Sequence, residues 1–242
     1  GKFKGDEVVF VMAGGNDAFG LLGELTAAAT AAGKAEGDKV GAETFATSLT
    51  GQLAAGATSP STAAAAIGAA IATESKRVGS TSQTIVGVAV ATAAAQPGNM
   101  AVGSPAVYGP MVAKAQADAA TAGAAAGAKA GAAYATANGP SYVPRMADAA
   151  HALGALVRTQ IVAKGASHVV LVNLPDLGGT PYAKSQAAST QTLVNGMISA
   201  FNIALRVSVD GLDDKVLFVD AYAASQDQQL NPAKYGFTNT TK

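Results

Sequence analysis

The chain has 242 residues, of which 49% are hydrophobic and 13% are charged. These proportions indicate a globular protein with a sizeable core and exclude a disordered chain. The formal net charge is zero, so the composition provides no basic surface for nucleic acid or for an anionic membrane. Cysteine is absent, which excludes disulfides and thiolate metal sites. With only two histidines as well, we expect no metal and no cofactor.

The sequence also restricts the relation of the chain to a membrane. No uncharged apolar run is long enough to cross a bilayer as a single helix, so we expect no integral membrane segment. No signal peptide is visible. A chain that begins with Gly1 in place of methionine is consistent with removal of an N-terminal segment.

The first predicted strand is the apolar run 8–13, which ends in Gly14-Gly15-Asn16-Asp17. A short run of β-branched and aromatic residues bounded by glycine is typical of a strand buried on both faces, as in a parallel sheet. Asn16 would then lie at the carboxyl end of that strand, where open α/β sheets bind their ligands. Its amide could donate a hydrogen bond to an oxygen that becomes negative in a transition state. The alternative is a tight turn with an Asx cap.

Residues 21–140 differ in composition from the rest, since alanine, glycine, serine and threonine dominate. We expect a mostly helical insertion there, because alanine is the best helix former. Its clearest helix is 111–137, in which Gly123, Gly127 and Gly131 recur at every fourth position and would allow another helix to approach closely. The apolar stretch 84–91 fits either a strand or a buried helix.

The last hundred residues alternate between helix and strand patterns. We predict helices over 141–164 and 188–210, and short buried strands over 168–173 and 215–220. A Pro- and Gly-containing loop, 174–181, follows the first of these strands. This alternation is typical of βαβ units with a parallel sheet.

Three segments resemble the SGNH, or GDSL, family of esterases and lipases. Val11 to Asp17 resembles the third signature block of that family, Gly-x-Asn-Asp. The run from Asn173 to Pro181 resembles its Asn-Leu-Pro-x-Leu-Gly-x-x-Pro turn, which borders the substrate cleft. The tail from Asn231 to Asn239 resembles the segment before the last family motif. The three segments occur in the family's order.

The resemblance implies a fold and an activity. The fold would be a three-layer α/β/α sandwich of flavodoxin-like type with a parallel sheet. Residues 1–242 would form a single domain, with 21–140 as an insertion that could serve as a lid. The activity would be hydrolysis of a small-molecule or lipid carboxylic ester through a serine ester. Asn16 would be an oxyanion donor, Gly15 would shape the oxyanion hole, and Pro175 and Asp176 would contact substrate. Many bacterial members are secreted, so the family implies a secreted or periplasmic protein.

Three blocks of the family are missing from this sequence, and one of them, the second, supplies a glycine as a further oxyanion donor in the family. Its first block, Gly-Asp-Ser, carries the nucleophile, and here Gly5-Asp6-Glu7 has no serine. Its last block, Asp-x-x-His, is matched in spacing only by Asp148 and His151, which lie in a predicted helix at the wrong place in the family order. The resemblance therefore implies a companion chain that carries the serine and the Asp/His pair. The alternative is a non-catalytic binding or structural module on a hydrolase scaffold.

Overall fold

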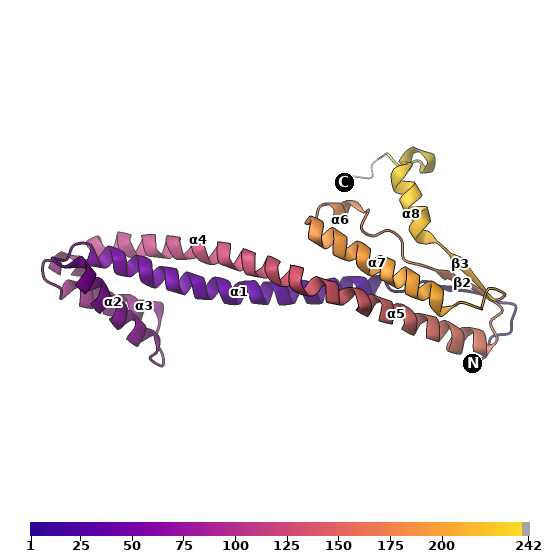
Figure 1. The fold of residues 1–242 in the computed structure, drawn as a ribbon, viewed down its shortest axis with the longest axis horizontal. Helices are drawn as coiled ribbons and strands as arrows, with labels where there is room; N and C mark the ends of the chain where they lie inside the picture. Colours follow the sequence, from indigo (N-terminus) through magenta and orange to yellow (C-terminus); the bar gives the residue numbers. More distant parts are fainter. Residues whose placement is uncertain (239–242) are drawn as a thin grey trace. The chain divides into compact units, whose positions relative to one another are not determined.

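The computed structural model describes residues 1–238, so Asn239, the last residue of the tail resemblance, lies outside the described residues. Helices make up 72% of the structure, and the strands form one small sheet. The chain divides into two compact units (Figure 1). The sheet unit comprises Gly1–Ala28 and the chain from Tyr134 onward, and the helical unit comprises Ala29–Ala133.

The helical unit consists of long and short helices around a small core. Its elements are α1 (Gly15–Ala54), α2 (Pro60–Ser75), α3 (Ser82–Ala94), the 3₁₀ turn η1 (Met100–Gly103) and α4 (Pro105–Asn138), of which α1 starts and α4 ends in the sheet unit. The ambiguous stretch 84–91 is helical, because Thr81 and Thr84 form a reciprocal capping box that starts α3. Leu49, Leu53 and Ile67 are fully buried in this core.

Glycines bring α1 and α4 into backbone contact within the helical unit (Figure 1). Gly37 on α1 faces Gly123 on α4, and Gly33 faces Gly127, so the two helices run antiparallel. A methyl group on Gly37 would lie 2.8 Å from the carbonyl oxygen of Gly123, well inside ordinary contact distance. The glycines at every fourth position thus have the role expected from the sequence, which is to allow close approach of a second helix.

The sheet unit has three parallel strands in the order β1-β2-β3. They are β1 (Val8–Val11), β2 (His168–Val172) and β3 (Val216–Val219). Val9 pairs with Val169, which pairs with Val216 in turn. The predicted strands and their parallel direction are therefore confirmed.

Helices of the sheet unit follow the predicted alternation. The longer ones are α5 (Tyr142–Leu156), α7 (Ala188–Ser208) and α8 (Ala221–Leu230), with a short α6 (Pro181–Lys184) before α7. Single turns of 3₁₀ or π geometry complete the unit: η2 (Gly139–Ser141), η3 (Val157–Ile161), η4 (Val162–Lys164) and η5 (Pro232–Tyr235). None of the helices within residues 1–238 is both long and apolar enough to cross a membrane.

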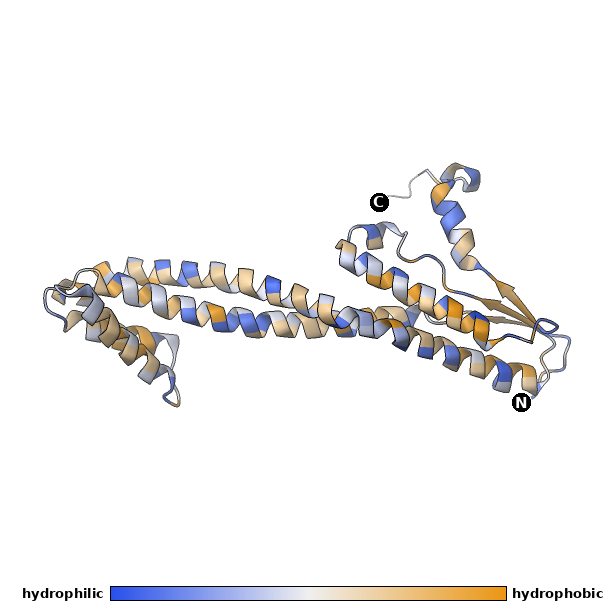
Figure 2. Ribbon diagram, viewed as in Figure 1, coloured by the Kyte–Doolittle hydropathy of each residue, from blue (hydrophilic) through white to orange (hydrophobic). Residues whose placement is uncertain are grey.

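One face of the sheet is covered by α5 and α7. Val169 and Leu171 of β2 are buried on this face against Met146 of α5 and against Met197 and Phe201 of α7. In Figure 2 the strands are coloured as hydrophobic, and α5 and α7 carry both hydrophobic and hydrophilic residues. This layer contains the core of the sheet unit.

The other face of the sheet is uncovered in the described residues, so the prediction of a three-layer α/β/α sandwich is wrong. Phe10 is 74% exposed, Leu217 64% and Val8 56%, although all three are apolar and lie on strands. The strand sequences predicted burial on both faces because apolar residues occupy successive positions. The structure has a helical layer on one face only, and much of the remaining chain is in the long helices α1 and α4.

Candidate functional site

The connection from β1 to α1 positions the first predicted site residues. Gly14 has φ +108, and a methyl group there would lie 2.3 Å from Cζ of Phe201. Only glycine satisfies both constraints, so the chain turns at Gly14 and α1 begins at Gly15. The N-terminus of α1 is thereby fixed against α7, at the carboxyl end of β1.

Asn16 lies within the first turn of α1 and is exposed to solvent. Its side chain makes no hydrogen bond to another described residue, so it does not form the Asx cap that was the alternative. The first helical bond of α1 runs from the N–H of Ala18 to the carbonyl of Gly14, at 3.1 Å. The N–H groups of Gly15, Asn16 and Asp17 precede that bond and have no acceptor within the helix. The turn therefore presents backbone donors and one free amide.

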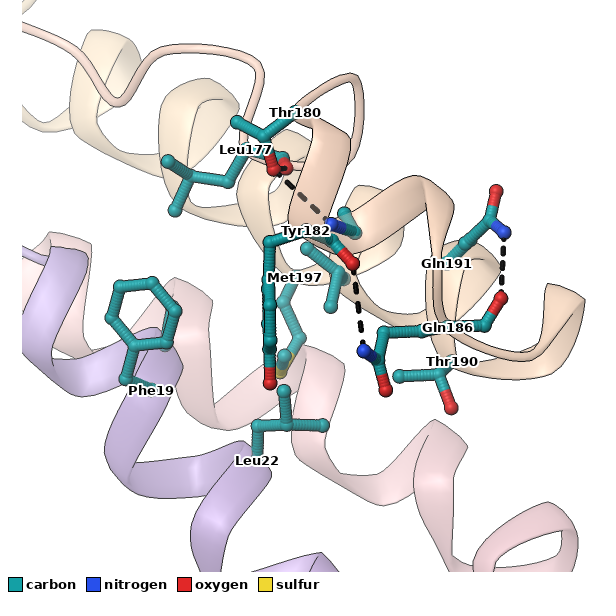
Figure 3. Close-up of a pocket in the computed structure, with 12 residues that line it drawn as sticks. Phe19, Leu22, Leu177, Thr180, Tyr182, Gln186, Thr190, Gln191 and Met197 are labelled. Carbon is teal, nitrogen blue, oxygen red and sulfur yellow. Dashed lines mark hydrogen bonds between the residues drawn. The ribbon is translucent and has the colours of Figure 1, made fainter. Parts of the chain in front are cut away.

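An apolar pocket of about 440 Å³ lies beside this turn (Figure 3). It is formed by α1, the loop after β2, α6 and α7, all within the sheet unit. Gly15, Ala18, Phe19 and Leu22 follow the i, i+3, i+4, i+7 spacing of one helical stripe, and the last three line the pocket. A methyl group on Gly15 would meet no atom within 4 Å, so the space beside it is open.

The pocket has a buried floor and an exposed mouth. Met197 is fully buried, and Ala18 and Ala183 are nearly so. At the mouth, Phe19 is 57% exposed and Tyr182 is 64% exposed. Figure 3 shows the Phe19 ring on α1 across from the Tyr182 ring on α6, with the two rings set apart.

Three polar side chains of the lining donate hydrogen bonds to neighbouring groups. The Thr180 hydroxyl donates to Leu177 O at 2.7 Å. The Gln191 amide donates to Gln186 O at 2.8 Å, and the Gln186 amide donates to Ser185 Oγ at 3.2 Å. Because no charged residue lines the pocket and most of its lining side chains are apolar, its interior favours an uncharged apolar ligand.

The loop after β2 is held in place by side-chain amides. Asn202 of α7 accepts from the Leu174 N–H at 2.9 Å and donates to its carbonyl at 2.8 Å. Asn173 is buried and donates to Asp220 at 2.9 Å. The pKa of Asp220 lies below its ordinary value, because its carboxylate accepts from the backbone N–H of Ala223 and from Asn173. These bonds fix Leu177 and Thr180 beside the pocket.

Two predicted contact residues, Pro175 and Asp176, lie in this loop but outside the set that lines the pocket. The carboxylate of Asp176 accepts from the Gly179 N–H at 3.0 Å, and its own N–H donates to Ser225 Oγ at 2.7 Å. The structure thus shows Asp176 shaping the loop. Gly15 and Asn16 precede the lining residue Ala18 on α1 but are likewise outside the lining, so the predicted roles of all four residues stay predictions.

A histidine and a serine meet elsewhere in the sheet unit. His151 Nδ1 lies 2.8 Å from Ser208 Oγ, between α5 and α7. The Ser208 hydroxyl donates its hydrogen to the Ala204 carbonyl at 2.7 Å, so His151 is the donor in this pair and does not activate the serine. Asp148 and His151 therefore remain neighbours on α5 with no catalytic arrangement. Among the described residues, no group of three or more acidic or histidine side chains could hold a metal ion.

The pocket itself was not predicted from the sequence. Phe19 and Leu22 could have been identified from the stripe that begins at Gly15, and Met197 belongs to an apolar stripe of the predicted helix 188–210, whereas Tyr182 carried no comparable signal. Comparison with protein-family models, curated proteins and solved structures gives no match for this chain. A functional assignment therefore rests on the geometry of the site and on the three short sequence resemblances.

Proposed function

We propose that the chain supplies the oxyanion donors and the substrate pocket of a carboxylic ester hydrolase. The observation that carries this proposal is the position of Asn16. Its free amide lies one helical turn before Phe19, at roughly 5–6 Å between Cβ atoms, and Phe19 lines the apolar pocket. An ester with its apolar part in the pocket would have its carbonyl close to this amide.

The first turn of α1 adds to the electrostatic part of the proposal. The unpaired N–H groups at a helix N-terminus favour negative charge, and the helix dipole acts in the same direction. Together with the Asn16 amide they would stabilise the oxyanion of a tetrahedral intermediate. Gly15 contributes because its missing side chain leaves the approach to these N–H groups open.

The nucleophile would come from a companion polypeptide that carries a serine and an Asp/His pair. Support for a companion comes from the uncovered face of the sheet, where Phe10 and Leu217 are exposed. Parallel sheets are normally covered on both faces. In addition, β1 and β3 each pair only with β2 among the described residues, so each has a free edge. A second polypeptide could cover the face and extend the sheet.

The test is hydrolysis of chromogenic esters by the isolated chain and by material purified from its natural source. The intact masses of the purified material would reveal a companion polypeptide. We expect negligible turnover by the chain alone and turnover by the complex. In the complex, Asn16→Ala should reduce turnover by about 10²–10³, the typical cost of losing an oxyanion donor. Gln160→Ala, which removes an exposed side-chain amide of η3 outside the pocket lining, is the control. A reduction below about threefold, far under that range, would remove Asn16 from the mechanism.

A non-catalytic binding module is the second candidate. The observation in its favour is the chemistry of the pocket, whose described lining residues include no serine, histidine, aspartate or glutamate. If the purified natural material contains this chain alone and hydrolyses no ester, the binding module is the better assignment.

A further inference from the structure

The pocket beside α1 has the size and the lining of a site for a hydrocarbon chain. Its volume of about 440 Å³ falls in the range of small-molecule sites, roughly 300–1,000 Å³. An apolar cavity of about 150 Å³ accepts benzene. Scaled from the volume of that benzene cavity to the volume of the pocket, the space would accept roughly a dozen to eighteen non-hydrogen atoms.

The distribution of side chains indicates how such a ligand would enter. The exposed rings of Phe19 and Tyr182 flank the mouth, and the buried Ala18, Ala183 and Met197 form the floor. Small alanines leave depth at the floor, and methionine adapts its shape to a flexible ligand. The Thr180 hydroxyl and the Gln191 amide already donate to backbone carbonyls, so an apolar chain would not deprive these two groups of their hydrogen bonds.

We propose that this pocket binds an unbranched aliphatic chain, and that Ala183 limits the length of chain accepted. The inference rests on the proposed function only in assigning the chain to an ester, either to its acyl half or to its alcohol half. Binding of the chain itself requires no companion polypeptide, because every lining residue belongs to the sheet unit of this protein.

The binding experiment uses the full chain and two ligand series that displace the dye Nile red. One series is methyl esters of straight-chain acids, and the other is acetate esters of straight-chain alcohols. We expect affinity to rise about fourfold for each added methylene, the fold-change that corresponds to burial of one methylene. The rise should stop when the pocket is full. An affinity that does not depend on chain length would overturn the proposal.

Three variants locate the bound chain. Phe19→Glu places a charge at the mouth on an exposed position, so the fold should persist, and we expect at least about a tenfold loss of affinity. Ile203→Glu, on an exposed position of α7 outside the pocket lining, is the matched control and should bind as the wild type does. In Ala183→Leu the affinity should stop rising at a shorter chain length than in the wild type. If the two glutamate variants lose the same amount of affinity, the ligand binds elsewhere. The same conclusion follows if the affinity of Ala183→Leu stops rising at the same chain length as that of the wild type.

Hydrolysis by the complete enzyme separates the two sources of the chain and the two proposals. Rates that rise with acid length assign the pocket to the acyl half, and rates that rise with alcohol length assign it to the other half. Length-dependent binding without hydrolysis would refute the proposed function and support the pocket assignment. Hydrolysis without length-dependent binding would support the proposed function and refute the pocket assignment.

Discussion

The glycine contact between α1 and α4 makes a quantitative prediction about the helical unit. Glycine in a helix interior costs about 1 kcal/mol relative to alanine. By propensity alone, Gly→Ala substitutions in α1 should therefore stabilise the protein. At Gly51 a methyl group would meet no atom within 4 Å, so Gly51→Ala should show this gain in full.

At Gly37 the same substitution meets the backbone of α4. The added methyl would lie 2.8 Å from Gly123 O, and ordinary contact begins at 3.4 Å, so the helices must separate by about half an ångström. A gap of that size already forfeits roughly a quarter of the dispersion energy of each affected contact. Overpacking of this kind costs about 1–3 kcal/mol. Gly37→Ala should therefore be less stable than Gly51→Ala by that amount, although the two changes are chemically identical.

The assay is thermal unfolding followed by circular dichroism at the helical band. For a unit of this size each kcal/mol corresponds to roughly 4–8 °C. The stability of the variants should follow the distance from each added methyl to the facing helix: 2.7 Å at Gly33, 2.8 Å at Gly37, 3.1 Å at Gly131, 3.4 Å at Gly41 and open space at Gly51. If Gly37→Ala is stabilised as much as Gly51→Ala, the backbone contact that we describe does not limit the helix spacing.

Three further predictions concern single residues. Gly14→Ala should lower the free energy of unfolding by about 2–5 kcal/mol, because it adds backbone strain and a clash with Phe201. A melting temperature near that of the wild type would contradict the role of Gly14 in the turn. The pKa of Glu74 is about 2, below its ordinary 4.5, because the Arg77 guanidinium hydrogen-bonds to its carboxylate. The stabilisation of the fold by ionised Glu74 is therefore complete above about pH 4.5 and is lost as the pH falls toward 2. The difference in melting temperature between wild type and Glu74→Gln should therefore shrink over that range, and a difference that grows on acidification would refute the linkage. Phe10→Lys, on the uncovered face, should leave the melting temperature unchanged within about 2 °C and abolish co-purification of the companion polypeptide that we propose. Retained co-purification would place the interface elsewhere.

Much of the sheet unit could be predicted from the sequence because its signals are local. Short apolar runs near glycines predicted the three strands, and their alternation with helices predicted the parallel direction of the strands. The long helices also followed from composition, since few residues other than alanine favour a helix so strongly. The stretch 84–91 stayed ambiguous because periodicity cannot separate a short buried helix from a strand. A capping box at Thr81 and Thr84 resolves it, and those threonines are visible in the sequence.

The number of layers could not be predicted in the same way. An apolar residue on a strand shows that burial would be favourable, but it does not show which polypeptide provides the cover. Val8 and Phe10 have the same pattern as Val169 and Leu171, yet only the second pair is buried in this structure. The pocket was missed for a related reason. Its walls come from segments more than 150 residues apart, and Tyr182 and Met197 acquire their positions only when α6 and α7 pack beside α1.

The correction to the fold leaves the candidate site in place, because each part of the site depends on the covered side of the sheet. Gly14 turns the chain against Phe201, and Asn202 holds Leu174 from the same helix, α7. One helix thus fixes both the N-terminus of α1 and the loop that borders the pocket. The uncovered face contributes none of these contacts. Asn16 and the apolar pocket both belong to the sheet unit of this chain, and the proposed hydrolysis would still need a serine and an Asp/His pair from a companion.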